Sequence, residues 1–556
     1  MSTSYFISNL HRLEKSLLPT PTSVRKGYNI LHENSASLIA KVTSAVANFF
    51  TFIVYSTLIP FTATYSLFFE KKRNIERIPE FNSGDYGLPD DVGFSDSHFQ
   101  TIGFGTRACP LENFKEGSNW DKWLNPSRIE GTEDGKYESF FTDIISKKGR
   151  SQFIKYLKDM NVTAYRFSLE WSVIQPSPNW FNMEAIRLYQ DFIEELMANG
   201  IKPYVTLHHF VHTQWFEDLG GFSKIKNVEV FVNYAKEVVK HFPKVKNWMT
   251  FNEPGIFAFQ SYIRGVYPPG IVGNIPLAGK VARNLMIAHT ELYKSLKKDN
   301  PNLEVGITHQ WLKFEPLGGN FIERIVCYFL SKITHYAVYN FFKNGVFSFQ
   351  IPFLANIKYS IPKKEFKKNN GYMDWIGVQF YGFPKLKVGF NKGIKYPGNK
   401  VTNLIWRGFG ITAGTTCKPD NHMMSFGPSY DPNSLVKALN EAKALGHPIV
   451  VSEIGADANV WGSGDSNFRL DNKAQRDYYE KVLTILEGFK LKAVFFWTWV
   501  RGHLEWDLGK TSRLGVTDIT RKNGVMDTYK LSSAATLLKN TFAMVSNKKS
   551  SRGAAA

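Results

Sequence analysis

Two glutamates follow short apolar runs, at positions from which a carboxylate could act on a reacting bond. Glu253 ends the stretch TFNE, and Glu453 ends the stretch IVVSE. Hydrolysis of a glycosidic bond requires two such groups, one protonated to donate to the leaving oxygen and one ionised to attack the anomeric carbon. Their surroundings must therefore push the two pKa values apart. A single carboxylate after a strand would more often cap a helix, but the pair favours glycoside cleavage.

Other polar and aromatic side chains also stand at the ends of apolar runs. Tryptophan offers a flat face against which the apolar side of a sugar ring can pack. If these runs are strands of one barrel, their ends meet at one face, where the chemistry of such a fold takes place. The residues concerned are Arg166, Glu170, Trp171, His208, His209, Asn252, Gln379, Tyr381, Trp497, Glu505 and Trp506.

A metal site is the main alternative use of these residues. His208, His209, His212 and Asp218 could be imagined as ligands. Adjacent histidines on a strand point to opposite faces, however, and no His-x-Glu-x-x-His spacing occurs. The three cysteines are odd in number and far apart, which argues against a disulfide framework. We expect no metal and no cofactor.

Eight predicted strands alternate with helix-length periodic segments after residue 100. This order predicts an α/β fold, a (β/α)8 TIM barrel with long loops. A doubly wound open sheet is the alternative, but no glycine-rich phosphate loop follows the first strand. The strands are predicted at Thr101–Thr106, Val162–Ser168, Lys202–Leu207, Trp248–Asn252, Glu304–Thr308, Asp374–Phe380, Pro448–Ser452 and Ala493–Trp497, and helices at Asn182–Asn199, Val228–Lys240, Val281–Lys298, Pro432–Leu445 and Lys473–Phe489.

An N-terminal hydrophobic segment precedes the barrel. Val42–Phe69 contains no charged residue and is long enough to span a bilayer, although Pro60 would kink or divide a helix there. We interpret it as a membrane-associating helical segment that spans the bilayer or lies in its interface; the alternative is an arm folded onto the barrel. The predicted organisation is therefore 1–95 for this region and its linker (80–98), 96–545 for the barrel and 546–556 for a disordered tail.

The net charge of 68 − 49 = +19 is strongly basic. A solvated lysine-rich surface explains it without a nucleic-acid partner, which we do not expect. Residues 363–400 carry nine lysines and two acids, and we interpret them as a surface loop that follows the sixth strand at the active-site end. With Val42–Phe69 this basic loop predicts membrane-associated localisation, the alternative being cytoplasmic.

Several motifs together resemble glycoside hydrolase family 1, the retaining β-glucosidase and β-galactosidase family, over roughly residues 100–545. TFNEP at 250–254 matches its acid/base motif, which assigns Glu253 as acid/base and Asn252 to the sugar 2-hydroxyl. VSEIG at 451–455 resembles its nucleophile motif and assigns Glu453. The resemblance implies carboxyl groups about 5–5.5 Å apart, as retention requires.

Four further motifs carry the resemblance. YRFSLEWSVIQP at 165–176, TLHHFVHTQWFEDLGGF at 206–222, DWIGVQFYG at 374–382 and FWTWVRGHLEW at 496–506 match strand-end motifs of the family. They imply that an arginine lies beside the nucleophile, a tyrosine donates to it, and a histidine, two tryptophans and a glutamate bind the sugar. These residues are Arg166, Tyr381, His209, Trp497, Trp506 and Glu505.

The chain departs from the family pattern at four places. The glutamine that the family has after its first strand, in a Tyr-Gln-Ile-Glu-Gly context, corresponds best to Glu112 within GFGTRACPLEN at 103–113. Gln379 and Ile454 stand where the family has asparagine, and one extra residue separates Trp497 from Glu505.

The predicted function is a retaining β-glycosidase that acts on β-glucosides or β-galactosides, with a carbohydrate or a glycolipid as substrate. One alternative is a membrane-bound transglycosylase, similar to the plastid-envelope galactosyltransferases that remodel galactolipids. A second is a non-catalytic sugar-binding module on the same barrel. The presence of both glutamates favours an enzyme, because non-enzymatic relatives lack one or both.

Overall fold

The fold is taken from a computed structural model of the whole chain. The residues that it describes are 86–96, 117–121, 123, 144, 146–316, 321–352, 354–390, 409–413, 433–456, 458–461, 468–470, 472–501, 506, 514–522 and 525–555. Val42–Phe69 lies outside them, so the membrane prediction for that segment stays a prediction. Within the described ranges, no helix combines the length and the apolar character needed to cross a membrane.

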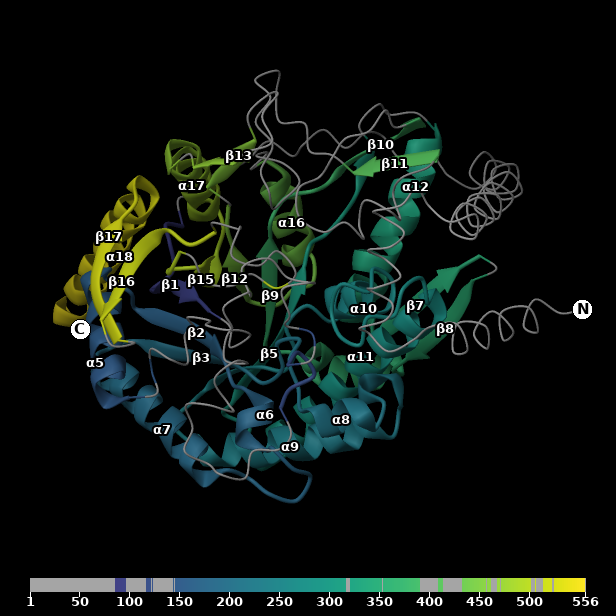
Figure 1. The fold of residues 1–556 in the computed structure, drawn as a ribbon, viewed down its shortest axis with the longest axis horizontal. Coiled ribbons are helices and arrows are strands. Elements are labelled where there is room, and N and C mark those ends of the chain that lie inside the picture. The colour runs from purple at the N-terminus through teal and green to yellow at the C-terminus, as the bar shows by residue number, and fades with distance from the viewer. Residues whose placement is uncertain are drawn as a thin grey trace, which may run out of the picture. The chain divides into compact units, whose positions relative to one another are not determined.

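Eight parallel strands close into a barrel, in the ring order β1, β2, β3, β4, β5, β9, β12, β15 and back to β1 (Figure 1). All eight neighbouring pairs are parallel. The strands are β1 (Asp91–Ser95), β2 (Ala164–Ser168), β3 (Lys202–Thr206), β4 (Asn247–Met249), β5 (Glu304–Gln310), β9 (Trp375–Phe380), β12 (Ile449–Ile454) and β15 (Leu491–Trp497). The predicted (β/α)8 barrel is thus confirmed, and seven of the eight predicted strands overlap those observed.

Helices follow every barrel strand and surround the barrel (Figure 1). The main ones are α5 (Lys147–Asp159), α7 (Met183–Ala198), α9 (Asn227–His241), α11 (Ile275–Asp299), α13 (Ala337–Asn344), α16 (Asn433–Lys443), α17 (Asn472–Glu487) and α18 (Ser533–Ala555). Shorter ones are α6 (Trp171–Ile174), α8 (Gln214–Asp218), α10 (Pro254–Tyr262), α12 (Phe321–Ser331) and α14 (Lys363–Lys368). The five predicted helices correspond to α7, α9, α11, α16 and α17.

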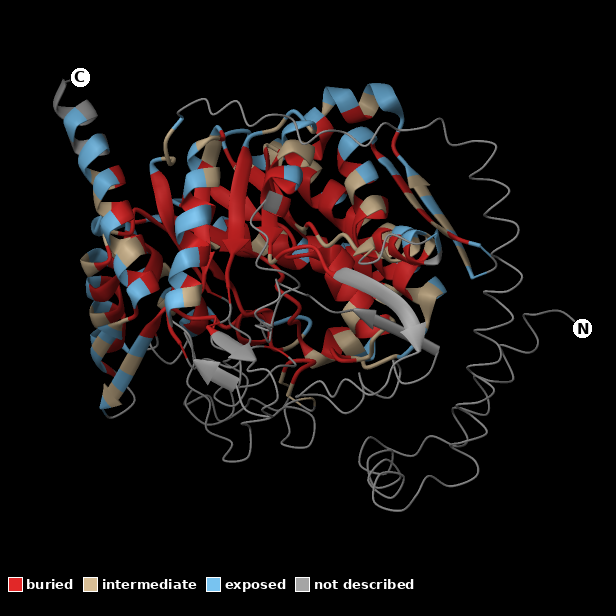
Figure 2. Ribbon diagram, turned by 90° about the horizontal axis from the view of Figure 1, so that it is seen from above, coloured by how far each residue is buried: buried red, intermediate tan, exposed pale blue. Residues whose placement is uncertain are grey.

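Helix α7 shows why these segments fold as they do. The Asn182 side chain accepts from the backbone N–H groups of Glu184 and Ala185, which caps the first turn. Buried side chains then recur at helical spacing, among them Ile186 and Ile193. This one apolar stripe faces the barrel, and Figure 2 shows outer helices that are likewise buried on one side and exposed on the other.

Side chains of alternate residues fill the barrel interior. Tyr204 and Trp375 pack there in a buried cluster with Ala164, Met249, Val450, Ala493 and Phe495. Successive residues of a strand point to opposite faces, so Arg166 lies on the same side of β2 as Ala164, two residues further toward the C-terminal end. The apolar interior therefore changes to polar side chains at that end of the barrel.

A long insertion separates β5 from β9. Besides α12, α13 and α14 it contains β6 (Glu315–Pro316), the π-helix η3 (Lys332–Tyr336), the hairpin of β7 (Val346–Ile351) and β8 (Ala355–Ser360), and the short η4 (Asn370–Tyr372). The remaining described elements are η2 (Gly221–Ser223), β10 (Lys385–Phe390), β11 (Phe409–Ala413), the pair β13 (Asn459–Trp461) and β14 (Phe468–Leu470), and the pair β16 (Thr517–Lys522) and β17 (Val525–Leu531).

The first strand is β1, and its prediction at Thr101–Thr106 is wrong. That range lies outside the described residues, and the strand that pairs with β2 and β15 is Asp91–Ser95, inside the predicted linker. Its sequence DVGFS lacks an apolar run. A Cβ atom added to Gly93 would lie only 1.8 Å from the Ala164 carbonyl oxygen. Glycine there permits the close approach to β2, so the barrel begins before residue 96.

Two further expectations need correction. The tail expected to be disordered over 546–556 belongs to α18 as far as Ala555, because the packed part of that helix, including the buried Phe542, lets helical hydrogen bonding propagate into the polar end. Residues 363–400 are not one loop after the sixth strand. They include that strand, β9, and the lysines of α14 precede it, at the barrel end opposite the active site.

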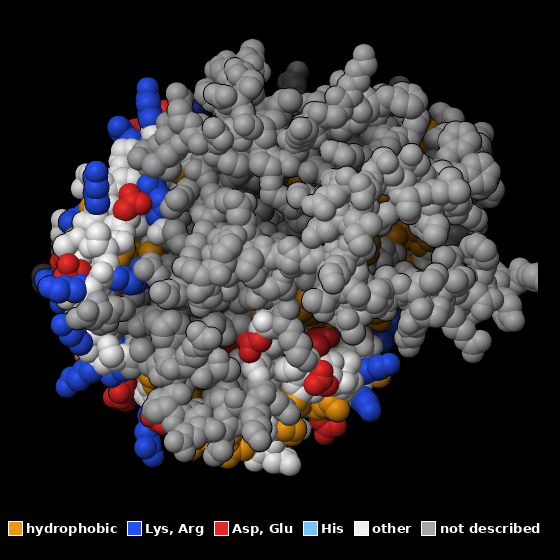
Figure 3. Space-filling view, viewed as in Figure 1, with side chains coloured by type: hydrophobic (Ala, Val, Ile, Leu, Met, Phe, Trp, Pro, Cys, Tyr) orange, Lys and Arg blue, Asp and Glu red, His pale blue; other side chains and the backbone are white. Residues whose placement is uncertain are grey.

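Charged side chains of both signs are interspersed around the visible rim of the molecule in Figure 3. Mixed signs are typical of a solvated surface.

Candidate active site

Glu453 reaches the barrel interior through an irregularity in β12. Val450 fills the interior, so strict alternation would turn Glu453 outward. The pairing of β12 with β9 shifts register between Val451 and Glu453, which is a β-bulge or similar irregularity. Such a bulge re-aims a side chain, and here the Glu453 carboxylate meets Arg166 of β2, whose Nη1 lies 2.5 Å from Oε1.

The Glu453 carboxylate has two further polar neighbours. The Tyr381 hydroxyl, just after β9, donates to Oε2 over 2.7 Å. His209 Nε2 lies 3.9 Å from Oε1, and its Nδ1 is 2.7 Å from the Ser168 hydroxyl oxygen. An arginine and a tyrosine that both donate to one carboxylate stabilise its ionised form.

Glu253 lies at the turn between β4 and α10. Its backbone has φ 41° and ψ 61°, in the left-handed region, and Pro254 begins α10 directly after it. Its amide N–H donates to the Thr308 carbonyl oxygen over 3.1 Å. The carboxyl group is buried, and its Oε1 has no hydrogen-bond partner among the residues that the structure describes.

The two carboxyl groups therefore differ in the state that their surroundings favour. Burial, and next the charge of Glu453, raise the pKa of Glu253 well above its usual value, and Arg166 offsets only part of this rise. Burial also raises the pKa of Glu453, but there the Arg166 charge and the hydrogen bonds from Tyr381 and Arg166 oppose it. The surroundings of Glu253 favour its protonated form, whereas those of Glu453 offer more support to a negative charge.

Aromatic rings form one wall beside these carboxyl groups. The His209 ring lies 5.9 Å from the Trp497 ring and 5.3 Å from the Trp506 ring. Trp506 also contacts Phe210 at 4.9 Å and Tyr267 at 5.7 Å. Such faces can pack against a sugar ring.

Backbone strain is concentrated at the same place. Six non-glycine residues of the described chain have positive φ, and three of them, Phe210, Glu253 and Trp506, belong to this site. This conformation is unfavourable for non-glycine residues, and such positions cluster at active sites.

The structure thus brings together Arg166, His209, Asn252, Glu253, Tyr381, Glu453, Trp497 and Trp506, at the C-terminal ends of β2, β3, β4, β9, β12 and β15. Asn252 joins through its Oδ1, which accepts from Arg166 Nη2 over 2.6 Å. Glu505 and Glu112 lie outside the described residues. The assignment of Glu112 rested on a first strand at Thr101–Thr106, and with β1 at Asp91–Ser95 that reason no longer holds.

Sequence reasoning missed residues that hold the site together. Arg166 Nη1 donates to the Ser95 hydroxyl over 2.7 Å. The Asp96 carboxylate accepts from Thr498, which follows Trp497, and from the Tyr165 hydroxyl over 2.5 Å. Ser95 ends the strand that was not predicted, and Asp96 follows it directly. Correct placement of β1 in the sequence would have exposed them as the polar end of a barrel strand.

Other residues singled out in the sequence make contacts of their own, apart from the two carboxyl groups. His208 Nε2 is 3.2 Å from His212 Nδ1, His212 Nε2 is 2.7 Å from Glu217, and burial lowers the pKa of His208 well below its usual value. Glu170 caps α6 through the Ser172 N–H. Among the residues that the structure describes, no group of three or more His, Cys, Asp or Glu side chains could hold a metal ion.

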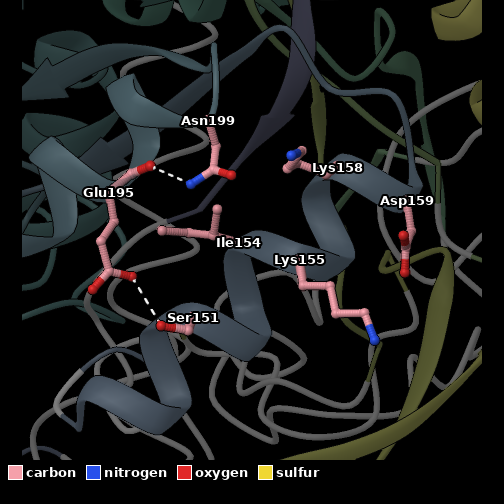
Figure 4. Close-up of a pocket in the computed structure, with 7 residues that line it drawn as sticks. All are labelled: Ser151, Ile154, Lys155, Lys158, Asp159, Glu195 and Asn199. Carbon is pink, nitrogen blue, oxygen red and sulfur yellow. Dashed lines mark hydrogen bonds between the residues drawn. The ribbon is translucent and has the colours of Figure 1, made fainter.

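A separate pocket lies between α5 and α7 on the outside of the barrel (Figure 4). Its lining includes Lys155, Lys158, Asp159 and Glu195, with Ser151 and Glu195 hydrogen-bonded across it. None of the residues around Glu453 or Glu253 contributes, and its charges are balanced.

Comparison with known proteins agrees with this geometry. The model of the family described as glycosyl hydrolase family 1 matches residues 109–539. Avenacosidase 2 of Avena sativa is 27% identical over 454 residues, covering 74% of this chain and 72% of that protein. A 6-phospho-β-galactosidase of Clostridium acetobutylicum is 27% identical over 423 residues, covering 69% and 87%.

Solved structures show the same fold. A rice β-glucosidase superposes with a TM-score of 0.64 at 21% identity, covering 82% of this chain and 98% of that one. The family model spans well over half of the chain, and the barrel carries a buried carboxyl pair where its chemistry would take place. The chain therefore belongs to glycosyl hydrolase family 1, and it is an enzyme of the retaining β-glycosidase type.

Proposed function

We propose that Glu453 is the nucleophile and Glu253 the general acid/base of this enzyme. The observation that carries the assignment is the asymmetry of their partners. Glu453 receives hydrogen bonds from Arg166 and Tyr381, whereas Oε1 of the buried Glu253 has none within the described ranges. A supported carboxylate suits attack, and an unsupported buried carboxyl group suits proton donation.

The proposed reaction has two steps. Glu453 attacks the anomeric carbon while Glu253 gives its proton to the departing oxygen, so the glycosidic bond breaks as the glycosyl–enzyme ester forms. Glu253, now ionised, takes a proton from an incoming water, whose oxygen displaces Glu453 from the anomeric carbon. The products are the free sugar and the alcohol, and both carboxyl groups return to their first states.

We propose a neutral β-glucoside or β-galactoside as substrate. Glu505, from the resemblance, is proposed to accept hydrogen bonds from the sugar 4- and 6-hydroxyls, and a carboxylate there would repel a phosphate dianion. The alternative substrate is a phosphorylated glycoside, because one relative is named a 6-phospho-β-galactosidase. Faster cleavage of a 6-phospho-β-glycoside than of the neutral glycoside would overturn this assignment.

The proposed sugar platform consists of Trp497 and Trp506, with His209 and Asn252 as polar contacts. Since β1 ends at Ser95, the sequence HFQTIG at 98–103 fits the family's glutamine context better than the segment around Glu112. Gln100 therefore replaces Glu112 as the proposed contact after the first strand. A Gln100→Ala variant should lose sugar affinity, with Glu112→Ala as its control.

A screen of aryl β-glycosides and of glucosyl and galactosyl lipids tests the function, with both free sugar and transfer products measured. Hydrolysis of aryl β-glucosides or β-galactosides is the expected result. Transfer to an alcohol in preference to water would favour the transglycosylase, and no turnover of any substrate would favour the sugar-binding module.

We propose further that Val42–Phe69 brings the enzyme to a membrane and to glycosides with apolar or lipid aglycones. The support is the absence of charge over a length sufficient to enter a bilayer. Because β1 begins at Asp91, a truncation that tests this should start near residue 80. It should stay folded and active on aryl glycosides but act poorly on vesicle-borne glycolipid. If it aggregates while the full chain remains in the soluble fraction at low salt, the proposal is wrong.

A further inference from the structure

The side-chain carbonyl of Asn252 is the meeting point of three donors. Arg166 Nη2 donates to its Oδ1 over 2.6 Å, Gln379 Nε2 over 2.7 Å and Thr308 Oγ1 over 3.2 Å. The donors come from three strands of the barrel, β2, β9 and β5. Asn252 itself is buried, with 1% of its surface exposed.

This arrangement decides which way the Asn252 amide faces. If the amide were turned over, its NH₂ group would face the Arg166 guanidinium and the Gln379 NH₂ group, neither of which can accept a hydrogen bond. The oxygen must therefore point to the donors, and the NH₂ group points the other way. Among the described residues this NH₂ group has no hydrogen-bond partner, so it is available as a donor to a bound substrate.

The three donors are not equivalent. The Thr308 hydroxyl has a single hydrogen, and its oxygen also lies 3.1 Å from the Phe251 carbonyl oxygen, so it serves one acceptor at a time. Arg166 is shared with Glu453, to which it is bound more closely. Gln379 is the neutral donor whose side-chain hydrogen bond goes to Asn252.

Gln379 is also placed where packing alone would not favour a glutamine. It is fully buried, it pairs in register with Glu453, and its backbone oxygen accepts from the Trp311 N–H. Its Oε1 has no hydrogen-bond partner in the described part of the chain. An apolar side chain of similar length would avoid this unsatisfied acceptor, which indicates that the donor Nε2 is the part that matters.

We propose that Gln379 is a positioning residue that holds Asn252 as a hydrogen-bond donor toward the sugar oxygen next to the anomeric carbon. The inference rests on the proposed function, in which Asn252 contacts the 2-hydroxyl. Hydrogen bonds to that hydroxyl strengthen in the transition state of glycoside hydrolysis. Gln379 thus contributes to the preference for substrates that carry an oxygen at carbon 2.

The test compares kcat/KM for an aryl β-glucoside and for its 2-deoxy counterpart. Gln379→Met keeps the length of the side chain and removes the donor. The ratio between the two substrates should fall by about tenfold, as expected for one lost hydrogen bond, while cleavage of the 2-deoxy substrate stays near the wild-type value. A merely structural role would lower both rates together and leave the ratio unchanged.

Gln475→Met is the matched control. Gln475 is an equally buried glutamine, whose side chain donates to the Ala456 and Leu514 carbonyl oxygens. Its replacement should leave the ratio unchanged. If Gln379→Met does not fold, Gln379→Asn carries the test, because the side chain shortened by one methylene withdraws the same donor.

A double-mutant cycle with Asn252→Ala asks whether Gln379 acts through Asn252. In that background Gln379→Met should not change the ratio further. Two results would overturn the inference about Gln379 without touching the proposed function. One is a wild-type ratio between the two substrates in the single Gln379 variant, and the other is the same tenfold fall of that ratio in the Asn252→Ala background. No turnover of either glucoside by the wild-type enzyme would instead overturn the proposed function.

Discussion

Two pairs of acids with raised pKa values lie among the described residues, and they differ in what surrounds them. Glu253 and Glu453 share a pocket with Arg166, which donates to Glu453. Asp121 and Glu170 accept only from Ser118 and Ser172 within the described residues. Burial raises the pKa of Asp121 to about 6 and, with the charge of Asp121 as a further contribution, that of Glu170 to about 7.

The contrast separates burial from function. Burial alone raises the pKa of every one of these groups, so a raised pKa does not identify a catalytic acid. The catalytic pair needs, in addition, a partner that supports one member and not the other. Arg166 and Tyr381 supply that asymmetry for Glu453, and nothing comparable is described around Glu170.

Glu453→Gln should have the largest effect on activity. The amide preserves the shape of the side chain but cannot attack the anomeric carbon, so kcat for aryl β-glycosides should fall by several orders of magnitude. Circular dichroism should show an intact fold. Turnover near the wild-type value would contradict the proposed mechanism.

Glu253→Ala should have a large effect that depends on the leaving group. Activated aryl glycosides need no proton in the first step, so their kcat/KM should be largely spared, while glycosides of poor leaving groups should lose most of theirs. The second step lacks its base for every substrate, so kcat should fall even for activated glycosides, and azide, which needs no base, can take the place of water. Added azide should restore turnover and give a β-glycosyl azide. Equal losses for both classes of substrate would argue against the role of acid/base.

Tyr381→Phe should have a moderate effect on activity and should shift its pH dependence in a defined direction. The variant loses a donor to the ionised carboxylate, so the pKa of Glu453 should rise. Activity requires the ionised form, and the acidic limb of the kcat/KM profile should therefore move to higher pH, with a loss of about tenfold on the acidic side. An unmoved acidic limb would show that the hydroxyl does not support the charge.

Glu170→Gln should leave activity near the wild-type value and change the pH dependence of stability. The pKa of Glu170 is higher in the folded protein, about 7, than its ordinary value of 4.5, so protonation favours the folded state. The stabilisation is fully present below pH 4.5 and is lost as the pH rises through 7. The total loss is at most about 3 kcal/mol.

The neutral amide that Glu170→Gln introduces removes this loss, because it can still accept from the Ser172 groups without carrying a charge. Compared with the wild type, the variant should therefore gain stability as the pH rises from 4.5 to about 8, one unit above the folded-state pKa. Urea unfolding at the two pH values measures the difference. A free-energy difference between variant and wild type that does not change with pH would contradict the assignment of Glu170 as a buried structural acid.

The sequence by itself determined the barrel and most of the residues in its site. Seven barrel strands were found because their apolar runs are strong, and the proposed catalytic pair was singled out because each glutamate follows such a run. The first strand was missed because DVGFS has no apolar run, and its identity depends on pairing with β2 and β15, which are distant in the sequence.

Only the tertiary structure determined the direction in which the side chains of the site point. Strict alternation would have turned Glu453 away from the barrel, and the register shift between β12 and β9 turns it inward. The orientation of the Asn252 amide depends on donors more than 50 residues away in the sequence. Local sequence encodes the strands, but the direction of a side chain at a strand end is set by neighbouring strands that the closed barrel brings together.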